Sequence, residues 1–256
     1  MSGRESWIHK FDSGLKPDGE RPWRPMVVSM MEDAVKDIDS PTIVDVGCGL
    51  QSWALAASGI ENGEKIGVDP DPDAMSNKDV DRVVIAPADH IPLPDATADL
   101  VISSYLLEHV ENPSQALREF ARILKPGGRL IVWTPNKYNY AIALSSLTPC
   151  WLHNWARRLA KPGASKDNCP TFYRANTPRG LKRLMRNAGL ELTDKIRFGA
   201  TAYQYWKFSK WLFAIAAFGS RIASATPLEC LKSILIAQAV KPNQSYPLPT
   251  HNKSAT

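Results

Sequence analysis

The most constraining feature of this sequence is the stretch TIVDVGCGLQSWALAAS at residues 42–58. Its apolar run at 43–46 predicts a buried parallel strand, the glycines at 47–49 predict a tight turn, and residues 53–57 predict the start of a helix. Glycines let a backbone approach a ligand closely, and the start of a helix presents unpaired N–H groups beside the turn. The stretch therefore indicates a nucleotide-binding turn, with an ordinary strand-to-helix turn as the alternative.

Two classes of nucleotide cofactor are compatible with such a turn. A dinucleotide-binding turn has the pattern G-x-G-x-x-G, whereas here Gly47, Cys48 and Gly49 are followed by L-Q-S, without a third glycine. Asp45 lies at the end of the predicted strand, where a carboxylate would repel a pyrophosphate and attract a cationic group. The sequence therefore favours a positively charged cofactor.

The segment IVDVGCG resembles the first motif of the class I S-adenosylmethionine (SAM)-dependent methyltransferases, V-[LV]-D-[VL]-G-C-G. The resemblance assigns to Asp45 the acidic position beneath the amino-acid and sulfonium end of SAM. Gln51 departs from the third glycine that this family often has. The resemblance implies SAM as cofactor and S-adenosylhomocysteine (SAH) as product. It also implies an α/β Rossmann-like fold, in which a mostly parallel sheet of seven strands carries helices on both faces and a helical cap or insertion follows strand five.

An acidic residue also ends the second predicted strand, where K-I-G-V leads into Asp69 and Pro70. In a βαβ unit a carboxylate about 20 residues after the glycine turn can accept hydrogen bonds from both ribose hydroxyls. Methyltransferases resembling this chain use an acid there in the same way. The alternative is that Asp69 only begins an Asp-Pro turn.

The loop after the third predicted strand, 82–86, carries the third acidic position. Members of the family typically have an aspartate there facing the adenine amino group, and Asp89 matches it. The fourth strand, 98–103, runs into a position that we expect beside the methyl group, because ligands of open α/β sheets lie at the carboxyl ends of strands. The predicted cofactor contacts are Asp45, Gly47, Cys48, Gly49, Asp69, Pro70, Ala88, Asp89, His90 and Ser104.

The phrase LEHVENPSQALREFARILKPGG at 107–128 is the most specific part of the resemblance, which covers about 41–136. It is typical of the methyltransferases of quinone and related small-molecule biosynthesis. Strand four does not end in N-P-P-Y or D-P-P-Y, which argues against enzymes that methylate DNA bases or glutamine amides. We expect a helix to open at 106–110 and a second to run from 113 to the Pro-Gly-Gly turn, followed by strand five at 129–133.

His109 is the candidate catalytic residue. A hydroxyl nucleophile benefits from a base that titrates near pH 7, whereas a carboxylate nucleophile needs none. The Glu108-His109 pair also resembles metal-dependent quinone methyltransferases, but these have a further Glu where this chain has Tyr105, so no metal is expected. Capping or orienting the local loop is the alternative role for His109.

Charge is unevenly distributed along the chain. Residues 1–128 contain 12 Lys+Arg and 22 Asp+Glu, whereas residues 129–256 contain 19 and 4. The basic half suggests a membrane surface, an acidic small molecule or a nucleic acid as partner, with a solvated basic surface as the alternative. Aromatic residues with flanking lysines at 205–222 are compatible with peripheral membrane contact, but burial against the sheet or in a dimer is the favoured interpretation.

One methyltransferase domain is expected over 26–240, after a lead segment at 1–25 and before a flexible tail at 241–256. Within it, 137–175 and 199–231 are expected to form cap or insertion regions. The four cysteines are far apart and form no C-x-x-C pair, so neither a zinc site nor a disulfide framework is indicated. The residues MSGRESWIHKFDSG lack an apolar signal core, so a cytoplasmic location is expected, with peripheral membrane contact as an addition.

These observations together predict a SAM-dependent methyltransferase that acts on a small-molecule or lipid-like acceptor, preferentially at oxygen. We expect a monomer or homodimer and do not expect nucleic acid as a partner. The alternatives are an RNA or membrane-glycan methyltransferase, a non-catalytic SAM-binding module, and a dehydrogenase that uses the same turn.

Overall fold

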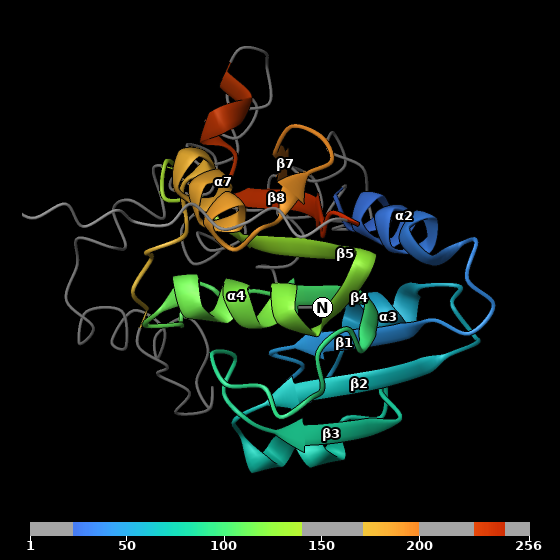
Figure 1. The fold of residues 1–256 in the computed structure, drawn as a ribbon. Helices are drawn as coiled ribbons and strands as arrows, with labels where there is room; N and C mark the ends of the chain where they lie inside the picture. The colour runs from blue at the N-terminus through green and yellow to red at the C-terminus, as the bar shows by residue number, and fades with distance from the viewer. Residues whose placement is uncertain (1–22, 140–170, 200–227, 244–256) are drawn as a thin grey trace, which may run out of the picture. The chain divides into compact units, whose positions relative to one another are not determined.

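The computed structural model describes residues 23–139, 171–199 and 228–243 (Figure 1). The lead segment, most of the expected cap, the aromatic segment at 205–222 and nearly all of the tail lie outside these ranges. The chain divides into two compact units. The larger comprises 27–134, 170–197 and 235–256, and the smaller comprises 1–26, 135–169 and 198–234.

The fold is organised around a sheet in which the strands follow the order β3-β2-β1-β4-β5-β8-β6. Strands β1 to β5 pair in parallel, whereas β6 and β8 are antiparallel. The eighth strand, β7, pairs with β8 off this path, so the expected mostly parallel seven-stranded order is confirmed with one short strand added. The strands are β1 (Thr42–Val46), β2 (Glu64–Asp69), β3 (Arg82–Ile85), β4 (Ala98–Ser104), β5 (Leu124–Pro135), β6 (Glu191–Leu192), β7 (Arg197–Gly199) and β8 (Ile234–Val240).

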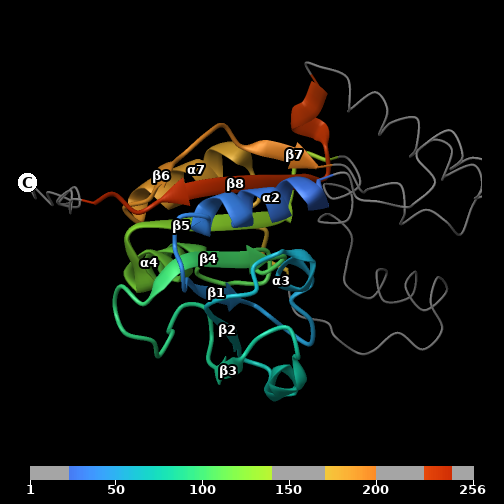
Figure 2. The ribbon, with the colours of Figure 1, turned by 90° about the vertical axis from the view of Figure 1, so that its right-hand side faces the viewer.

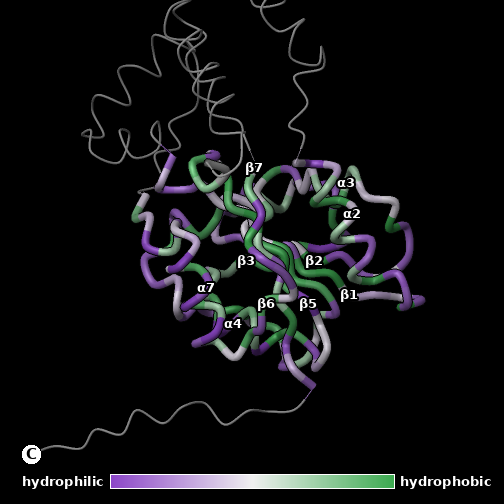
Figure 3. Tube along the Cα trace, turned by 90° about the horizontal axis from the view of Figure 1, so that it is seen from above, coloured by the Kyte–Doolittle hydropathy of each residue, from purple (hydrophilic) through white to green (hydrophobic). Residues whose placement is uncertain are grey.

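Helices cover both faces of the sheet, as the sequence predicts. α4 (Pro113–Ile123) and α7 (Pro178–Asn187) lie on one face, and α2 (Arg24–Val35) and α3 (Trp53–Ala57) lie on the other (Figure 2). Hydrophobic residues are concentrated along the central strands between these helical layers (Figure 3). Strand order reverses between β1 and β4, and open α/β sheets bind ligands beyond the carboxyl ends of the strands at such a reversal.

Alternation of side chains along β1 decides which residues reach the reversal point. Val44 and Val46 join the buried core that includes α4 residues, so Asp45 between them faces the α3 side. Its register partners are Gly67 of β2 and Ile102 of β4. The acidic side chain of Asp45 therefore lies at the centre of the sheet, on the face covered by α3.

Two local expectations are wrong. Residues 107–109 form a turn instead of a helix, because the carbonyl of Glu108 accepts hydrogen bonds from the backbone N–H groups of Phe172 and Tyr173. α4 ends at Ile123, before the Pro-Gly-Gly turn, because Leu124 already pairs with Ala98 of β4. A register shift between residues 98 and 100 absorbs the intervening residues of β5.

The segment 191–199 forms two short strands, β6 and β7. Only β6 and β7 are extended enough to pair, and both pair with β8. Between them, the side chain of Asp194 accepts a hydrogen bond from the backbone N–H of Lys195, which forms a local bend. The basic helix α7 precedes this region, and the hydroxyl of Thr177 caps it by accepting from the N–H of Gly180.

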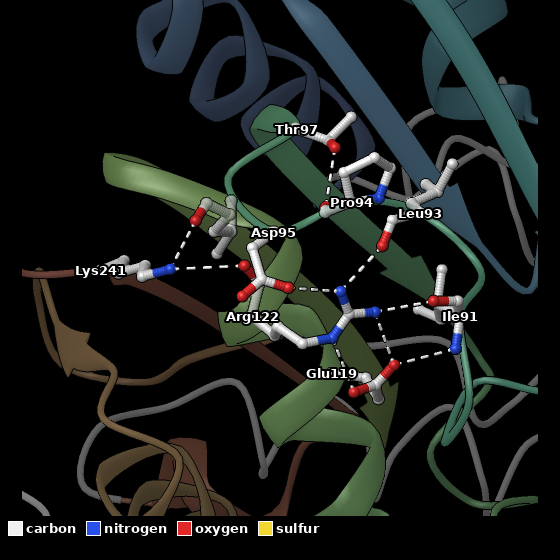
Figure 4. Close-up of polar contacts among 9 residues, drawn as sticks. Ile91, Leu93, Pro94, Asp95, Thr97, Glu119, Arg122 and Lys241 are labelled. Atoms are coloured by element: carbon white, nitrogen blue, oxygen red, sulfur yellow. Dashed lines mark hydrogen bonds and ion pairs between the residues drawn. The ribbon is translucent and has the colours of Figure 1, made fainter.

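The loop between β3 and β4 is held by one arginine of α4 (Figure 4). Arg122 donates to the carbonyls of Ile91 and Leu93 at 2.7 and 2.8 Å, and to the carboxylates of Asp95 and Glu119 at 2.8 Å each. The adjacent guanidinium holds the pKa of Glu119 below its usual range. This loop follows directly on residues 88–90, so Arg122 helps to fix one side of the predicted site.

Candidate functional site

The glycine turn after β1 has the backbone that its sequence predicts. Gly47 and Gly49 have φ values of +81° and +49°, in the left-handed region that glycine adopts without strain. A Cβ on Gly47 would lie 3.1 Å from the side chain of Leu106, so this position also lacks space. A Cβ on Gly49 would have no neighbour within 4 Å, which leaves room for a ligand at the turn.

Asp69 at the end of β2 is tied to this turn. Its Oδ2 accepts a hydrogen bond from the N–H of Gly49 at 2.9 Å, and its Oδ1 accepts one from the N–H of Asp71 at 2.9 Å. Each carboxylate oxygen has a second lone-pair site, so the half-buried group retains the capacity to accept two hydroxyls. The geometry fits the ribose role predicted for Asp69 and adds a structural role.

Asn77 is a residue of this site that the sequence analysis missed. Its side-chain amide donates to the carbonyl of Cys48 at 3.2 Å, the carbonyl of Gly49 at 3.1 Å and the hydroxyl of Ser52 at 3.2 Å. Its Oδ1 accepts from the N–H of Asp79 at 2.9 Å. The sequence shows only a polar residue in a turn-rich segment, and such a signal cannot identify partners 25 to 29 residues away.

Asp45 is the most unusual titratable group of the site. It is 3% exposed, and its Oδ1 has no hydrogen-bond partner in the structure as described. Its pKa is raised to about 7, mainly by burial; a hydrogen bond with Ser52 opposes this rise, and the negative charges of Asp69 and Asp79 contribute to it. A cation placed beside this carboxyl would favour its ionised form.

A cavity of about 220 Å³ opens beside the turn. It is lined by Asp45, Gly47, Cys48, Gly49, Leu50, Gln51, Ser52, Trp53, Ala54, Ser104 and Trp133. The rings of Trp53 and Trp133 form one wall, edge to face, with their centroids 5.5 Å apart. Trp133 was not singled out from the sequence, although its place at the end of predicted strand five puts it at the same sheet edge as Ser104.

The structure brings together part of the predicted cofactor set. Five of the predicted contacts line the cavity, and Asp69 joins them through Gly49. Pro70 is exposed, Ala88 is buried and His90 is exposed, and none of them lines this cavity. Asp89 is half-buried and lines a second, more open cavity with Arg174 and Arg183. The cofactor contacts of these residues therefore stay predictions.

His109, the candidate base, lies half-buried in the turn after β4. Its backbone N–H donates to the carbonyl of Leu106 at 2.8 Å, and the residue does not line the 220 Å³ cavity. Its catalytic role therefore stays a prediction.

The neighbouring Glu108 is 3% exposed and forms a buried polar chain that sequence patterns did not indicate. The hydroxyl of Thr134 donates to Glu108 Oε2 at 2.9 Å, and Asn176 donates to Thr134 Oγ1 at 2.7 Å. Burial raises the pKa of Glu108 to about 7. These hydrogen bonds attach the turn that carries His109 to the end of β5.

Cys48 contributes its backbone to the site. Burial is the main cause that raises the pKa of its thiol to about 12, so the thiol stays protonated at neutral pH. Its side chain packs where a Cβ on Gly67 would come within 2.6 Å of the sulfur. The thiol is therefore a packing group and not a nucleophile.

Two searches bear on other kinds of site. In the three described ranges, no three or more His, Cys, Asp or Glu residues are grouped so that they could hold a metal ion. Over the same ranges, no helix has the length and apolar character required to span a bilayer.

Comparison with protein families agrees with the geometry. A family model described as "Methyltransferase domain" matches residues 44–132, which begin inside β1 and end inside β5. The matched segment thus contains the glycine turn, Asp69, Asn77 and the loop held by Arg122.

Curated relatives carry related names. The ubiquinone/menaquinone biosynthesis C-methyltransferase UbiE of Laribacter hongkongensis is 44% identical over 64 residues, which are 23% of this chain and 26% of that protein. The ubiquinone biosynthesis O-methyltransferase of Maricaulis maris is 31% identical over 98 residues, 38% of this chain and 35% of that protein. The chain spans between about a quarter and a half of the length of the curated relatives it matches.

A solved structure extends the likeness of fold over nearly the whole chain. A chain from the complex between the Haloferax volcanii Trm112 methyltransferase activator and its methyltransferase has a TM-score of 0.58 and 20% identity. The match covers 95% of this chain and 97% of that one. Residues 44–132 of this chain therefore match the methyltransferase domain model, and the sheet that contains them has the fold of solved methyltransferases.

Proposed function

We propose that this chain binds SAM beside the glycine turn and transfers its methyl group to a small-molecule or lipid-like acceptor at oxygen. The observation that carries the proposal is Asp45, which lines the cavity beside Gly47 and Gly49 and whose buried Oδ1 has no partner among the described residues. When bound, SAM supplies a methyl group on a sulfonium cation. The chain's own residues bind the cofactor, orient the acceptor and remove the proton from its hydroxyl group.

Charge supports a cationic ligand in this cavity. Asp45, Asp69 and Asp79 act together on the site, since the latter two both raise the pKa of Asp45. A group with an ammonium and a sulfonium charge relieves this repulsion, whereas a pyrophosphate would increase it. Asp69 supports the same ligand because its oxygens can accept ribose hydroxyls in addition to the N–H groups of Gly49 and Asp71.

The acceptor side is proposed from the residues that follow β4. His109 lies in the turn five residues after Ser104, where a base that accepts the proton of a hydroxyl would assist attack by oxygen. The two quinone-biosynthesis relatives bear the names of a C- and an O-methyltransferase, so the choice of oxygen is our proposal.

Calorimetric titration of the full chain tests the cofactor. We expect heat of binding with SAM and with SAH and none with NAD. We also expect Asp45→Asn to weaken SAM more than SAH, because SAM carries the additional sulfonium charge. Binding of NAD alone would contradict the proposal and favour a dehydrogenase.

A second experiment tests the acceptor atom. The chain is incubated with SAM carrying a ¹³C-methyl group and a panel of catechols and hydroxyquinones, and the product's methyl carbon is assigned by NMR. Attachment to oxygen, with a rate at pH 7 that falls about 100-fold in His109→Ala, is expected. Attachment to carbon would overturn the oxygen assignment, and tight RNA binding with a steep salt dependence would favour the RNA alternative.

A further inference from the structure

Trp133, at the carboxyl end of β5, has a hydrogen-bond donor without an acceptor. The side chain is 1% exposed, and its Nε1–H has no partner among the residues that the structure describes. Buried polar groups are nearly always hydrogen-bonded, and an exception at a ligand cavity indicates a group that a ligand completes. Trp133 lines the same cavity as Asp45.

The orientation of this donor is fixed from two sides. The backbone of Trp133 pairs with Ser104 of β4 and its carbonyl accepts from the N–H of Tyr105 at 2.9 Å. The ring packs against Trp53 of α3 at an interplanar angle of 69°. A donor held in this way loses little conformational entropy when it binds an acceptor.

Four backbone donors of the glycine turn are already used within the protein. The backbone N–H groups of Gly47, Cys48, Gly49 and Ser52 all donate to acceptors within the protein. Neither lysine nor arginine occurs among the described residues that line the cavity. An anionic group of a ligand would therefore have few donors there, and the buried indole of Trp133 is one of them.

We propose that Trp133 Nε1–H donates a hydrogen bond to the carboxylate at the amino-acid end of SAM, while Asp45 Oδ1 accepts from the ammonium of the same end. The inference rests on the proposed function. Two residues that line the cavity, Trp133 and Asp45, carry an unpaired buried donor and an unpaired buried acceptor, and such a pair complements a zwitterion. Its volume, about 220 Å³, is below the roughly 300–1,000 Å³ of pockets for drug-sized ligands, and suits one end of the cofactor.

The test uses two ligands that differ only in the carboxylate. Calorimetry of the full chain measures the dissociation constants of SAM and of decarboxylated SAM for the wild type and for Trp133→Phe, which keeps a ring and removes the N–H. We expect Trp133→Phe to weaken SAM about tenfold or more, since the lost hydrogen bond has a charged acceptor. The affinity for decarboxylated SAM should stay within twofold of the wild type.

A matched variant separates the donor from ring packing. Trp53→Phe removes an indole N–H from the other ring of the pair, so it should change the affinities for SAM and decarboxylated SAM by the same factor. Equal weakening of both ligands by Trp133→Phe would overturn the inference, because packing would then explain the loss. Unchanged SAM affinity in Trp133→Phe would also overturn it, with the proposed function intact.

A measurement on the wild type keeps the inference testable where Trp133→Phe does not fold. In ¹⁵N-tryptophan-labelled protein, one indole N–H resonance should move downfield when SAM is added and stay in place when decarboxylated SAM is added. An indole spectrum that responds identically to the two ligands would contradict the inference. A wild type that binds neither ligand would instead end the proposed function, and this inference with it.

Discussion

Gly49 and Asp69 are joined by a 2.9 Å hydrogen bond from the backbone N–H of the first to Oδ2 of the second, across 20 residues of sequence. The bond connects the turn after β1 to the end of β2. One carboxylate thus shapes the glycine turn and, in the proposed function, meets the ribose. The structural role of Asp69 and its proposed ribose contact can be measured separately, because a ligand without ribose hydroxyls leaves the glycine turn unchanged.

Replacement of Asp69 by alanine should weaken SAM and SAH binding about tenfold or more, since hydrogen bonds to a charged acceptor are lost. The ribose contribution is measured with SAH and its 2′,3′-dideoxy analogue by calorimetry. The wild type should prefer SAH, and Asp69→Ala should bind the two ligands equally. Asp71→Ala is the matched control, because it removes a nearby exposed carboxylate but keeps the N–H that Asp69 accepts, and its affinity should stay within about twofold. An unchanged SAM affinity in Asp69→Ala would end the ribose assignment.

Asn77 should be essential to the same turn. Asn77→Ala leaves the carbonyls of Cys48 and Gly49 without their donor, and we expect it to lower the free energy of unfolding by about 1–3 kcal/mol. Asn77→Asp should lower it further, because a carboxylate would face those two carbonyl oxygens and donate nothing to them. Urea denaturation measures both. Equal stability of Asn77→Asp and the wild type would contradict the donor role of this amide.

The parts of the site that the sequence predicts correctly are local. The strand-turn-helix order of residues 42–58 depends on apolar periodicity and on the dihedral angles that glycine allows. Both depend only on residues that are adjacent in the sequence. Asp69 is found because its distance from the glycine turn follows from one βαβ unit.

The parts that the sequence does not predict depend on distant partners. Glu108, Thr134 and Asn176 form one chain across separations of 26 and 42 residues, and no short pattern marks such a chain. The helix expected at 106–110 is absent for the same reason, since the carbonyl of Glu108 is bonded to residues from another segment. Asp89 lines a different cavity from Asp45, so its adenine contact stays a prediction.

Asp45 should make the protein less stable as the pH rises. Its folded pKa of about 7 lies above its ordinary value of 3.8, so between these values the folded state binds more protons than the unfolded state. The free energy of unfolding therefore falls as pH rises from about 4 to 7, and the loss is complete above the folded pKa. Asp45→Asn should remove this cost and stabilise the ligand-free protein at pH 8 by up to about 4 kcal/mol, at about 1.4 kcal/mol per pKa unit.

Urea denaturation of both proteins at pH 5.5 and pH 8 tests this dependence. Glu108, whose burial also raises its pKa to about 7, adds a second contribution of the same sign, so Asp45→Asn should flatten the pH dependence only in part. Glu108→Gln is the control that should remove the remainder. A wild type that is more stable at pH 8 than at pH 5.5 would show that other groups outweigh these two. Asp45→Asn should at the same time bind SAM more weakly, because a neutral amide attracts the cationic cofactor less than a carboxylate does. A carboxyl group that serves ligand binding in this way is costly to the stability of the fold.

Gly67 and Cys48 should be energetically coupled. A Cβ on Gly67 would lie 2.6 Å from Cys48 Sγ and 3.3 Å from Cys48 Cβ, so Gly67→Ala should lower the free energy of unfolding by about 1–3 kcal/mol. Cys48→Ala removes the sulfur, and the double variant should recover about 0.5 kcal/mol or more of that loss relative to additivity. A double-mutant cycle by urea denaturation measures the coupling. Additive losses would mean that the strain of Gly67→Ala lies elsewhere, for example at Val80, whose methyl group is 3.3 Å away.

Arg122 should tolerate lysine poorly although the charge is kept. Its planar fork donates to the carbonyls of Ile91 and Leu93 and to two carboxylates, and a lysine ammonium has three donors on one atom and cannot reach all four. We expect Arg122→Lys to lower the free energy of unfolding by about 2 kcal/mol, since several hydrogen bonds to the arginine are lost. Arg118, one turn earlier on α4 and bonded only to Ser114 and Gln115 among the described residues, is the matched control.

Arg118→Lys should change the stability by less than about 0.5 kcal/mol, as exposed surface substitutions usually do. The two variants also differ in their expected effect on the site. Arg122 holds the loop that follows residues 88–90, so Arg122→Lys should weaken SAM binding, whereas Arg118→Lys should leave it unchanged. Calorimetry and urea denaturation of the same two variants test both effects. If Arg122→Lys were as stable as Arg118→Lys, the loop would be held by its prolines and its packing alone, and the guanidinium fork would contribute nothing measurable.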